Sequence, residues 1–272
     1  VWQDNSRGNW DLCARWAAEG GLWSDTVKVI DSNENQVRPA ICVDQGSAPR
    51  VYVAWQDDRA GNDDVYVAFT DDELLGPTVV RVTTDTAAQT DPAIAIGRDH
   101  AVYLVWTDLR NGSADLHGAC SADGYRSNVP VVRGPGDQTE PDLAVEPTGS
   151  VLHLVWVDDR AGDKDVYYAS THGIPSSPLE GVNLIDDTGP ADQSSPVIRA
   201  ALTDRGELEV FACWQDARTV GTITDTDLYF ADLGEGCSRT NVLVGDGQTN
   251  SPQSEPAMGV RADGHPFVVW TD

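Results

Sequence analysis

The stretch VYVAWQDDRAGNDDVYVA, residues 51–68, places two runs rich in β-branched and aromatic residues on either side of a polar loop. Such runs are typical of β-strands, and a glycine in the loop between them is typical of a hairpin. The loop carries Asp57, Arg59 and Asp64. Carboxylates beside an arginine are also what an acid–base site requires, so it matters whether this loop is unique.

The loop is not unique, because the same pattern recurs along the chain. Similar stretches occupy residues 102–119, 152–169 and 210–231. The Trp-x-Asp unit falls at intervals of 50 to 58 residues, at Trp2, Trp55, Trp106, Trp156, Trp214 and Trp270. A Gln-x-x-Pro unit keeps the same period, at residues 36–39, 89–92, 138–141, 193–196 and 253–256. Two landmarks in one register indicate a repeat architecture.

Each repeat has room for four strands. Residues 141–187 contain four strand-like runs, DLAVEP, SVLHLVWVD, DVYYAS and GVNLID, separated by turn residues. A four-stranded repeat of this length is the blade of a β-propeller, which has roughly 4–8 blades. We therefore predict an all-β fold, a five-bladed β-propeller of four-stranded antiparallel blades, as a single domain over residues 1–272.

The two ends of the chain predict how the ring closes. The C-terminal residues supply a first and a second strand and the N-terminal residues a third and a fourth, so both ends would share one blade and leave no sheet edge. The predicted blades cover 36–88, 89–137, 138–192 and 193–252, and the last combines 253–272 with 1–35. Residues 1–4 duplicate the second-strand end of 269–272. Six blades therefore stay possible, as does a piece of a longer array, and the absence of an initial Met fits a mature or excised piece.

The composition restricts the partners. With 44 acidic and 18 basic residues the chain has a formal net charge of -26, and such a chain repels nucleic acid and anionic membranes. No apolar run approaches the length of a membrane-spanning helix. We expect no nucleic-acid partner, no membrane insertion, a monomer, and a location outside the cell or at its surface, with the periplasm as the alternative.

The repeated loop favours a structural role. A catalytic site needs one constellation, whereas positions that return in every unit serve the stacking of units. Asp can accept backbone N–H groups, Arg can offer its fork to a carboxylate such as one on the next blade, and Trp can fill the space between blades. Structural calcium bound by loop carboxylates is the alternative; we expect no other cofactor. The motif residues are Trp55, Asp57, Arg59, Asp64, Trp106, Asp108, Arg110, Asp115, Trp156, Asp158, Arg160, Asp165, Trp214, Asp216, Arg218 and Asp227.

Function is expected where the repeats differ. The residue before the repeated proline changes from blade to blade, and it is Arg38, Asp91, Glu140, Ser195 or Glu255. In a propeller this loop lies at the mouth of the central channel. We predict that these five residues surround the channel mouth and bind a ligand there, because convergent polar groups in a concavity are the default site. A solvated rim on a very acidic protein would have the same sequence pattern.

The frame Q-x-x-P followed by V-x-W-x-D-x-R-x-G-x-x-D-V/L-Y resembles the repeats of bacterial secreted and cell-surface β-propellers of the sialidase-like or TolB-like kind. The resemblance covers nearly the whole chain and implies the fold, not an activity. The paired Gly-His and Trp-Asp spacing of WD repeats does not occur, and neither does the sialidase Asp-box S-x-D-x-G-x-x-W. Five-bladed glycosidases of the arabinanase type have the same blade number, but their blades usually diverge in sequence.

Two functions from different classes fit these observations. The first is a non-enzymatic extracellular module that binds a glycan or a protein partner on its loop-rich face, because near-uniform blades contain no unique catalytic set. The second is a five-bladed glycoside hydrolase that uses Asp91, Glu140 and Glu255 as acid, base or nucleophile, with carboxylates about 5–10 Å apart. The sequence alone favours the first.

Overall fold

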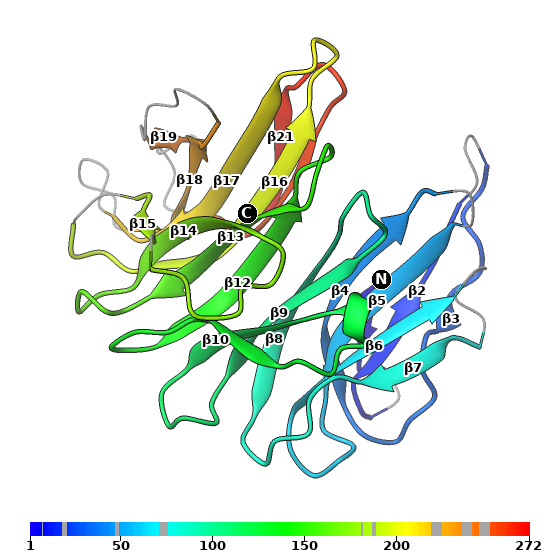
Figure 1. Cartoon of the computed structure of the whole chain (residues 1–272). Coiled ribbons are helices and arrows are strands. Elements are labelled where there is room, and N and C mark those ends of the chain that lie inside the picture. The colour runs from blue at the N-terminus through cyan, green and yellow to red at the C-terminus, as the bar shows by residue number, and fades with distance from the viewer. Residues whose placement is uncertain are drawn as a thin grey trace.

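A computed structural model describes residues 1–6, 8–17, 21–46, 49–70, 76–180, 182–186, 189–218, 225–234, 241–244 and 251–272. These residues form six antiparallel sheets and one short 3₁₀ helix, Ser121–Asp123. The sheets lie side by side around a common centre (Figure 1). The predicted all-β fold is confirmed. None of the helices in this part of the chain is long and apolar enough to cross a membrane.

Four sheets are complete blades of four strands hydrogen-bonded in chain order, as the repeat predicted. Blade 1 consists of β4 Gln36–Asp44, β5 Arg50–Asp57, β6 Asp64–Thr70 and β7 Thr78–Arg81. Blade 2 consists of β8 Gln89–Ile96, β9 Val102–Asp108, β10 Asp115–Cys120 and β11 Val129–Val132. Blade 3 consists of β12 Gln138–Val145, β13 Val151–Asp158, β14 Asp165–His172 and β15 Asn183–Leu184. Blade 4 consists of β16 Gln193–Leu202, β17 Leu208–Asp216, β18 Asp227–Asp232 and β19 Val242–Leu243.

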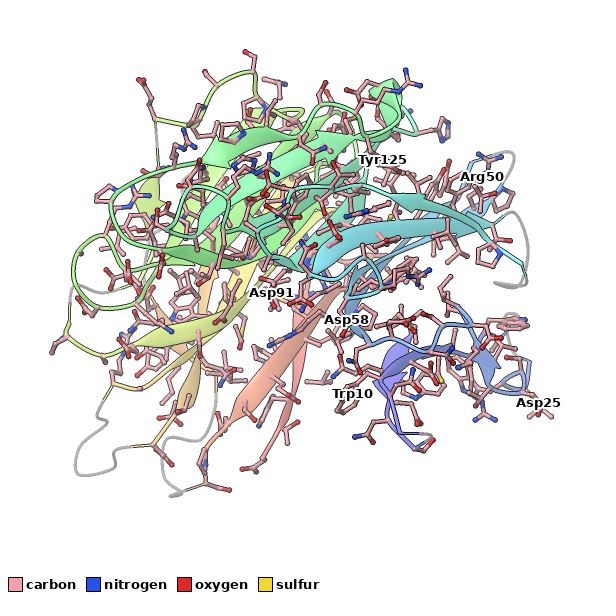
Figure 2. All side chains as sticks on the ribbon, turned by 90° about the horizontal axis from the view of Figure 1, so that it is seen from below. Trp10, Asp25, Arg50, Asp58, Asp91 and Tyr125 are labelled. Carbon is pink, nitrogen blue, oxygen red and sulfur yellow. The ribbon has the colours of Figure 1, made fainter. Side chains whose placement is uncertain are left out.

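The two ends of the chain form separate, incomplete sheets. The N-terminal sheet contains β1 Trp2–Asp4, β2 Asp11–Ala14 and β3 Val27–Lys28, and the C-terminal sheet contains β20 Ser254–Val260 and β21 Pro266–Thr271. In Figure 2 the C-terminal sheet (red) lies between blade 4 and the N-terminal sheet (blue). The predicted blade shared by both ends is therefore not formed in the described structure. The reason is the duplicated second strand, because β1 already occupies the edge of β2 that β21 would need.

The core lies between neighbouring blades. Trp55, Trp106, Trp156 and Trp214 are fully buried. Trp55 belongs to one cluster with Leu12 and Val29 of the N-terminal sheet, and Trp156 to one with Tyr103 of blade 2. Each tryptophan thus fills the space between its own blade and the preceding one, as predicted.

Every first strand has a bulge at the residue before the proline. Val37 lies opposite Gln56 and Ala40 opposite Ala54, so Arg38 and Pro39 together face one residue of β5. The same two-against-one arrangement occurs in β8, β12, β16 and β20. Proline has no N–H to give to the ladder, so a bulge accommodates it. The residue before it takes a left-handed backbone, with φ of 54° at Arg38, 50° at Asp91, 52° at Glu140, 50° at Ser195 and 52° at Glu255.

Candidate functional site

The repeated loop forms a closed cluster inside each complete blade. The Asp57 carboxylate accepts hydrogen bonds from Trp55 Nε1 at 2.7 Å, Arg59 N at 3.0 Å and Arg59 Nε at 2.8 Å. Asp108 and Asp158 bind the tryptophan and arginine of their own blades in the same way. Asp216 accepts from Trp214 Nε1 at 3.4 Å and from Arg218 N at 2.9 Å, and it pairs with Arg218 Nη2. The arginine fork therefore pairs with the aspartate two residues earlier in its own blade. The predicted pairing with a carboxylate on the next blade is wrong.

Burial and charge together stabilise this cluster, which we call the Trp–Asp–Arg clasp. All four aspartates are fully buried. Burial by itself would raise the pKa of Asp108, but hydrogen bonds from Arg110 and Trp106 outweigh it and hold that pKa below its ordinary value. The guanidinium of Arg59 lies 4.8 Å from the centre of the Tyr66 ring. Because the clasp groups bind one another, the predicted structural role fits better than catalysis.

The repeated glutamine joins neighbouring blades. Gln89 N donates to Asp63 O of blade 1 at 2.8 Å, and Gln89 Nε2 donates to Ala87 O at 2.6 Å. Gln36 and Gln193 make the same pair of bonds, and Gln138 differs only in that its Nε2 donates to Pro135 O, three residues earlier. These bonds join the loop between the second and third strands of one blade to the start of the first strand of the next blade. Both kinds of loop therefore lie on one face of the molecule, as predicted.

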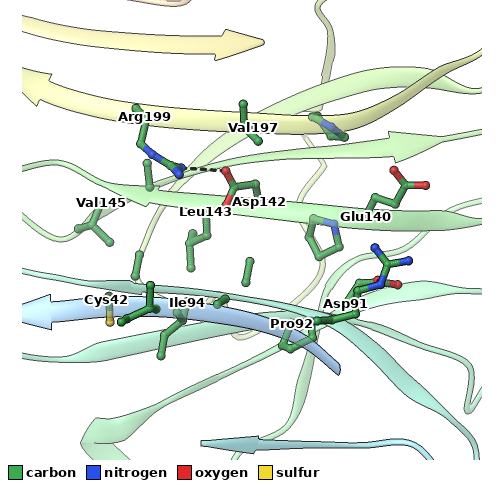
Figure 3. Close-up of a pocket in the computed structure, with 18 of the residues that line it drawn as sticks. Cys42, Asp91, Pro92, Ile94, Glu140, Asp142, Leu143, Val145, Val197 and Arg199 are labelled. Carbon is green, nitrogen blue, oxygen red and sulfur yellow. Dashed lines mark hydrogen bonds and ion pairs between the residues drawn. The ribbon is translucent and has the colours of Figure 1, made fainter. Parts of the chain in front are cut away.

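A cavity of about 760 Å³ lies among the inner strands β4, β8, β12 and β16 (Figure 3). Arg38, Asp91, Glu140 and Ser195 line it. The structure thus brings four of the five predicted site residues together. From β20 the lining includes Pro256 but not Glu255, which is exposed.

The residues with left-handed backbone connect one blade to the next. Arg38 Nε lies 3.3 Å from Asp91 Oδ1. Glu140 Oε2 accepts from Ser195 N at 2.7 Å, and Gln3 Oε1 accepts from Arg38 N at 2.9 Å. The bulge takes the backbone N–H of these residues out of the ladder. For Arg38, Ser195 and Glu255 a side chain of the preceding sheet binds that N–H instead.

Two charged residues of the cavity, Asp142 and Arg199, were not among the predicted site residues. Arg199 Nη1 lies 3.0 Å from Asp142 Oδ2, so the ion pair crosses from β16 to β12 (Figure 3). Arg199 Nε also donates to Met258 O on β20 at 3.0 Å. For Asp142 a signal was present in the repeat, since the residue after the proline is apolar in the other four repeats, at Ala40, Ala93, Val197 and Ala257.

Calcium in the loops stays a prediction. Among the residues that the structure describes, no three His, Cys, Asp or Glu side chains are grouped as a metal site requires. The extended loop of blade 4 lies partly outside the described residues, because 219–224 are not among them.

Comparison with known proteins identifies the fold. No protein-family model and no curated protein sequence matches the chain. A Hadza microbial sialidase is 15% identical with a TM-score of 0.57, over 90% of this chain and 54% of that chain. A protein of unknown function from Dyadobacter fermentans is 12% identical with a TM-score of 0.62, over 93% of this chain and 77% of that one. A thermostable family-43 glycoside hydrolase is 13% identical with a TM-score of 0.52, over 85% of this chain and 84% of that chain.

These likenesses show the fold alone, because all three identities are low. The chain has the β-propeller fold of sialidases and family-43 glycosidases. It spans about half the length of the sialidase.

Proposed function

We propose that this propeller acts on glycans outside the cell as a glycoside hydrolase, with the sugar bound in the cavity of the inner strands. The observation that carries the proposal is the convergence of Asp91, Glu140 and Asp142 on one cavity together with Arg38 and Arg199. Hydrolysis of a glycosidic bond requires a pair of carboxyl groups. Support also comes from a sialidase and a family-43 glycoside hydrolase that have the same fold.

The contacts of the three carboxylates suggest different roles. Asp91 and Asp142 each lie beside a guanidinium. A cationic neighbour suits a carboxylate that works in its charged form, as base or nucleophile. Among the described ion pairs none involves Glu140, whose partner is the neutral N–H of Ser195. Because it is the one of the three carboxylates without a cationic partner there, we assign it the role of general acid.

Substitution of the acid tests the proposal. The wild-type protein is assayed on a panel of aryl glycosides and polysaccharides, and the substrate that it cleaves is used for the variants. Glu140→Gln should lower kcat at least about 100-fold, as loss of a general acid does. Glu207→Gln, in the exposed turn of the β16–β17 hairpin, serves as the matched control and should retain wild-type kcat. Cleavage that survives Glu140→Gln unchanged would contradict the assignment.

A module that binds a glycan or a protein partner without cleaving is the second candidate. One observation favours it: each of the three carboxylates already has a protein partner, in Arg38, Ser195 N and Arg199. In that case calorimetry should detect binding of a glycan that yields no product on long incubation. Replacement of Glu140 should then alter affinity without any change in a catalytic rate.

A further inference from the structure

The C-terminal sheet has an apolar face that the complete blades bury. Phe267 lies three residues before Trp270 and is 52% exposed, whereas the equivalent Tyr52, Tyr103 and Phe211 are 8%, 5% and 5% exposed. Val269 is 60% exposed, whereas the residues at its position in the four complete blades, Ala54, Val105, Val155 and Cys213, are 0% exposed. These residues pack against the following blade wherever one is present.

Strand β4 has the complementary uncovered face. Ile41 lies five residues after the repeated glutamine and is 47% exposed, whereas the equivalent Ile94, Leu143, Ile198 and Met258 are 8%, 4%, 0% and 6% exposed. In the complete interfaces the two kinds of residue meet in one cluster, for example Tyr52 with Ile94, and Phe211 with Met258. Phe267 and Ile41 are therefore the two halves of an interface of the same kind that is not made.

Strand β21 also matches the edge of β2. In β1, Trp2 lies opposite Cys13, as Trp55 lies opposite Tyr66 in blade 1. Strand β21 carries Trp270 in the same Trp-x-Asp unit. It also brings the inner strand β20 with it.

We propose that the C-terminal sheet closes the ring by docking on β4, with β21 replacing β1 beside β2 and Trp270 opposite Cys13. Both surfaces belong to one chain, so tethering gives the contact a high effective concentration and favours it over pairing with a second copy. Closure buries Phe267, Val269 and Ile41, and it completes a four-stranded blade from β20, β21, β2 and β3.

Closure also changes the cavity. Glu255 precedes the proline of β20 just as Glu140 precedes that of β12, and Glu140 binds the N–H of the next blade at Ser195. In the closed ring Glu255 takes the same position toward Arg38 N, which Gln3 binds in the open form. The cavity then gains a fifth wall and a further carboxylate. Only the effect on catalysis rests on the proposed hydrolase function; closure itself does not.

Disulfide trapping tests the closed register. The other four cysteines are replaced by alanine, and Trp270→Cys is combined with the native Cys13 under mild oxidation at micromolar protein. We expect a disulfide within one chain between these two positions, in at least tenfold higher yield than with Phe267→Cys. Phe267 is the matched control because, at a separation of three residues, it lies on the opposite face of β21. Trp2→Cys measures the remaining open form.

Two outcomes overturn the proposal. A yield no higher than that of the Phe267→Cys control means that the sheets stay apart, and disulfides between chains mean that a second copy is the partner. Hydrogen exchange of the unmodified protein gives an independent measurement. Amides of β21 that do not bond to β20 should be protected like those of β5, and exchange at the rate of an open edge contradicts closure.

Discussion

The carboxylate of Asp108 is fully buried and binds both Trp106 and Arg110. Asp108→Asn should lower the free energy of unfolding by about 3 kcal/mol, because it removes one partner of a buried pair. Asp163→Asn, in the loop of the next blade, should cost less than about 0.5 kcal/mol. Urea unfolding monitored by tryptophan fluorescence measures both, and equal losses would contradict the clasp.

The pKa of Asp108 also predicts a pH dependence. Its pKa in the folded protein lies below the ordinary value, so the stabilising effect is fully present above the pKa of the unfolded chain. It is lost as the pH falls through the folded pKa. The stability difference between wild type and Asp108→Asn should therefore shrink on acidification below the usual aspartate range. A difference that stays constant even below that range would show that the charge of Asp108 is not what stabilises the blade.

Substitutions at Ser195 test whether the left-handed backbone before the proline is strained for residues other than glycine. A β-branched residue is poorly suited to its φ of 50°, so Ser195→Val should destabilise the protein by about 1–2 kcal/mol. Ser195→Gly should be within about 1 kcal/mol of wild type, because relief of strain offsets the greater entropy of the unfolded chain. Thermal unfolding compares the two variants, and a Val variant as stable as the Gly variant would contradict the strain.

At this scale the sequence predicts what repeats and misses what does not. The tryptophan, aspartate and glutamine positions recur, so their packing and bridging roles could be inferred. The left-handed backbone of the residues before the prolines could not be inferred, because the five side chains at this position differ although the backbone conformation is the same. Asp142 and Arg199 were also missed. Asp142 departs from the apolar residue at its repeat position, but its ion pair with Arg199 belongs to no recurring pattern that would assign it a role.

At the scale of strands and blades, burial of the same residue type differs between complete and incomplete sheets. Trp156 is fully buried between two blades, whereas Trp2, in the same unit of the N-terminal sheet, is 37% exposed. Trp156→Ala should cost about 3–5 kcal/mol, as large-to-small changes in a core do. Trp2→Ala should cost less than half of that. Denaturant unfolding measures both, and equal losses would contradict the difference in packing.

The boundaries of the four complete blades could be read from the Gln-x-x-Pro and Trp-x-Asp landmarks, because each landmark fixes the register of a strand pair. The arrangement of the two chain ends could not be read from these landmarks. Two second strands compete for the edge of β2, and a sequence pattern does not show which one is bound.

For the whole molecule, the need for a structural metal ion depends on whether the loop carboxylates already have partners in the protein. The motif aspartates Asp57, Asp108, Asp158 and Asp216 already bind arginine and tryptophan. We therefore expect that EDTA leaves the Tm unchanged within the error of differential scanning calorimetry. A fall in Tm that calcium reverses and magnesium does not would instead support calcium loops.

The Trp–Asp–Arg clasp has a consequence for how such a chain can evolve. Each clasp is satisfied inside its own blade, so duplication or deletion of one whole repeat leaves no buried charge without its counter-ion. Recombination between repeats therefore changes the number of blades at little electrostatic cost. Diversity can then accumulate at the position before the proline, where successive repeats already carry arginine, aspartate, glutamate and serine.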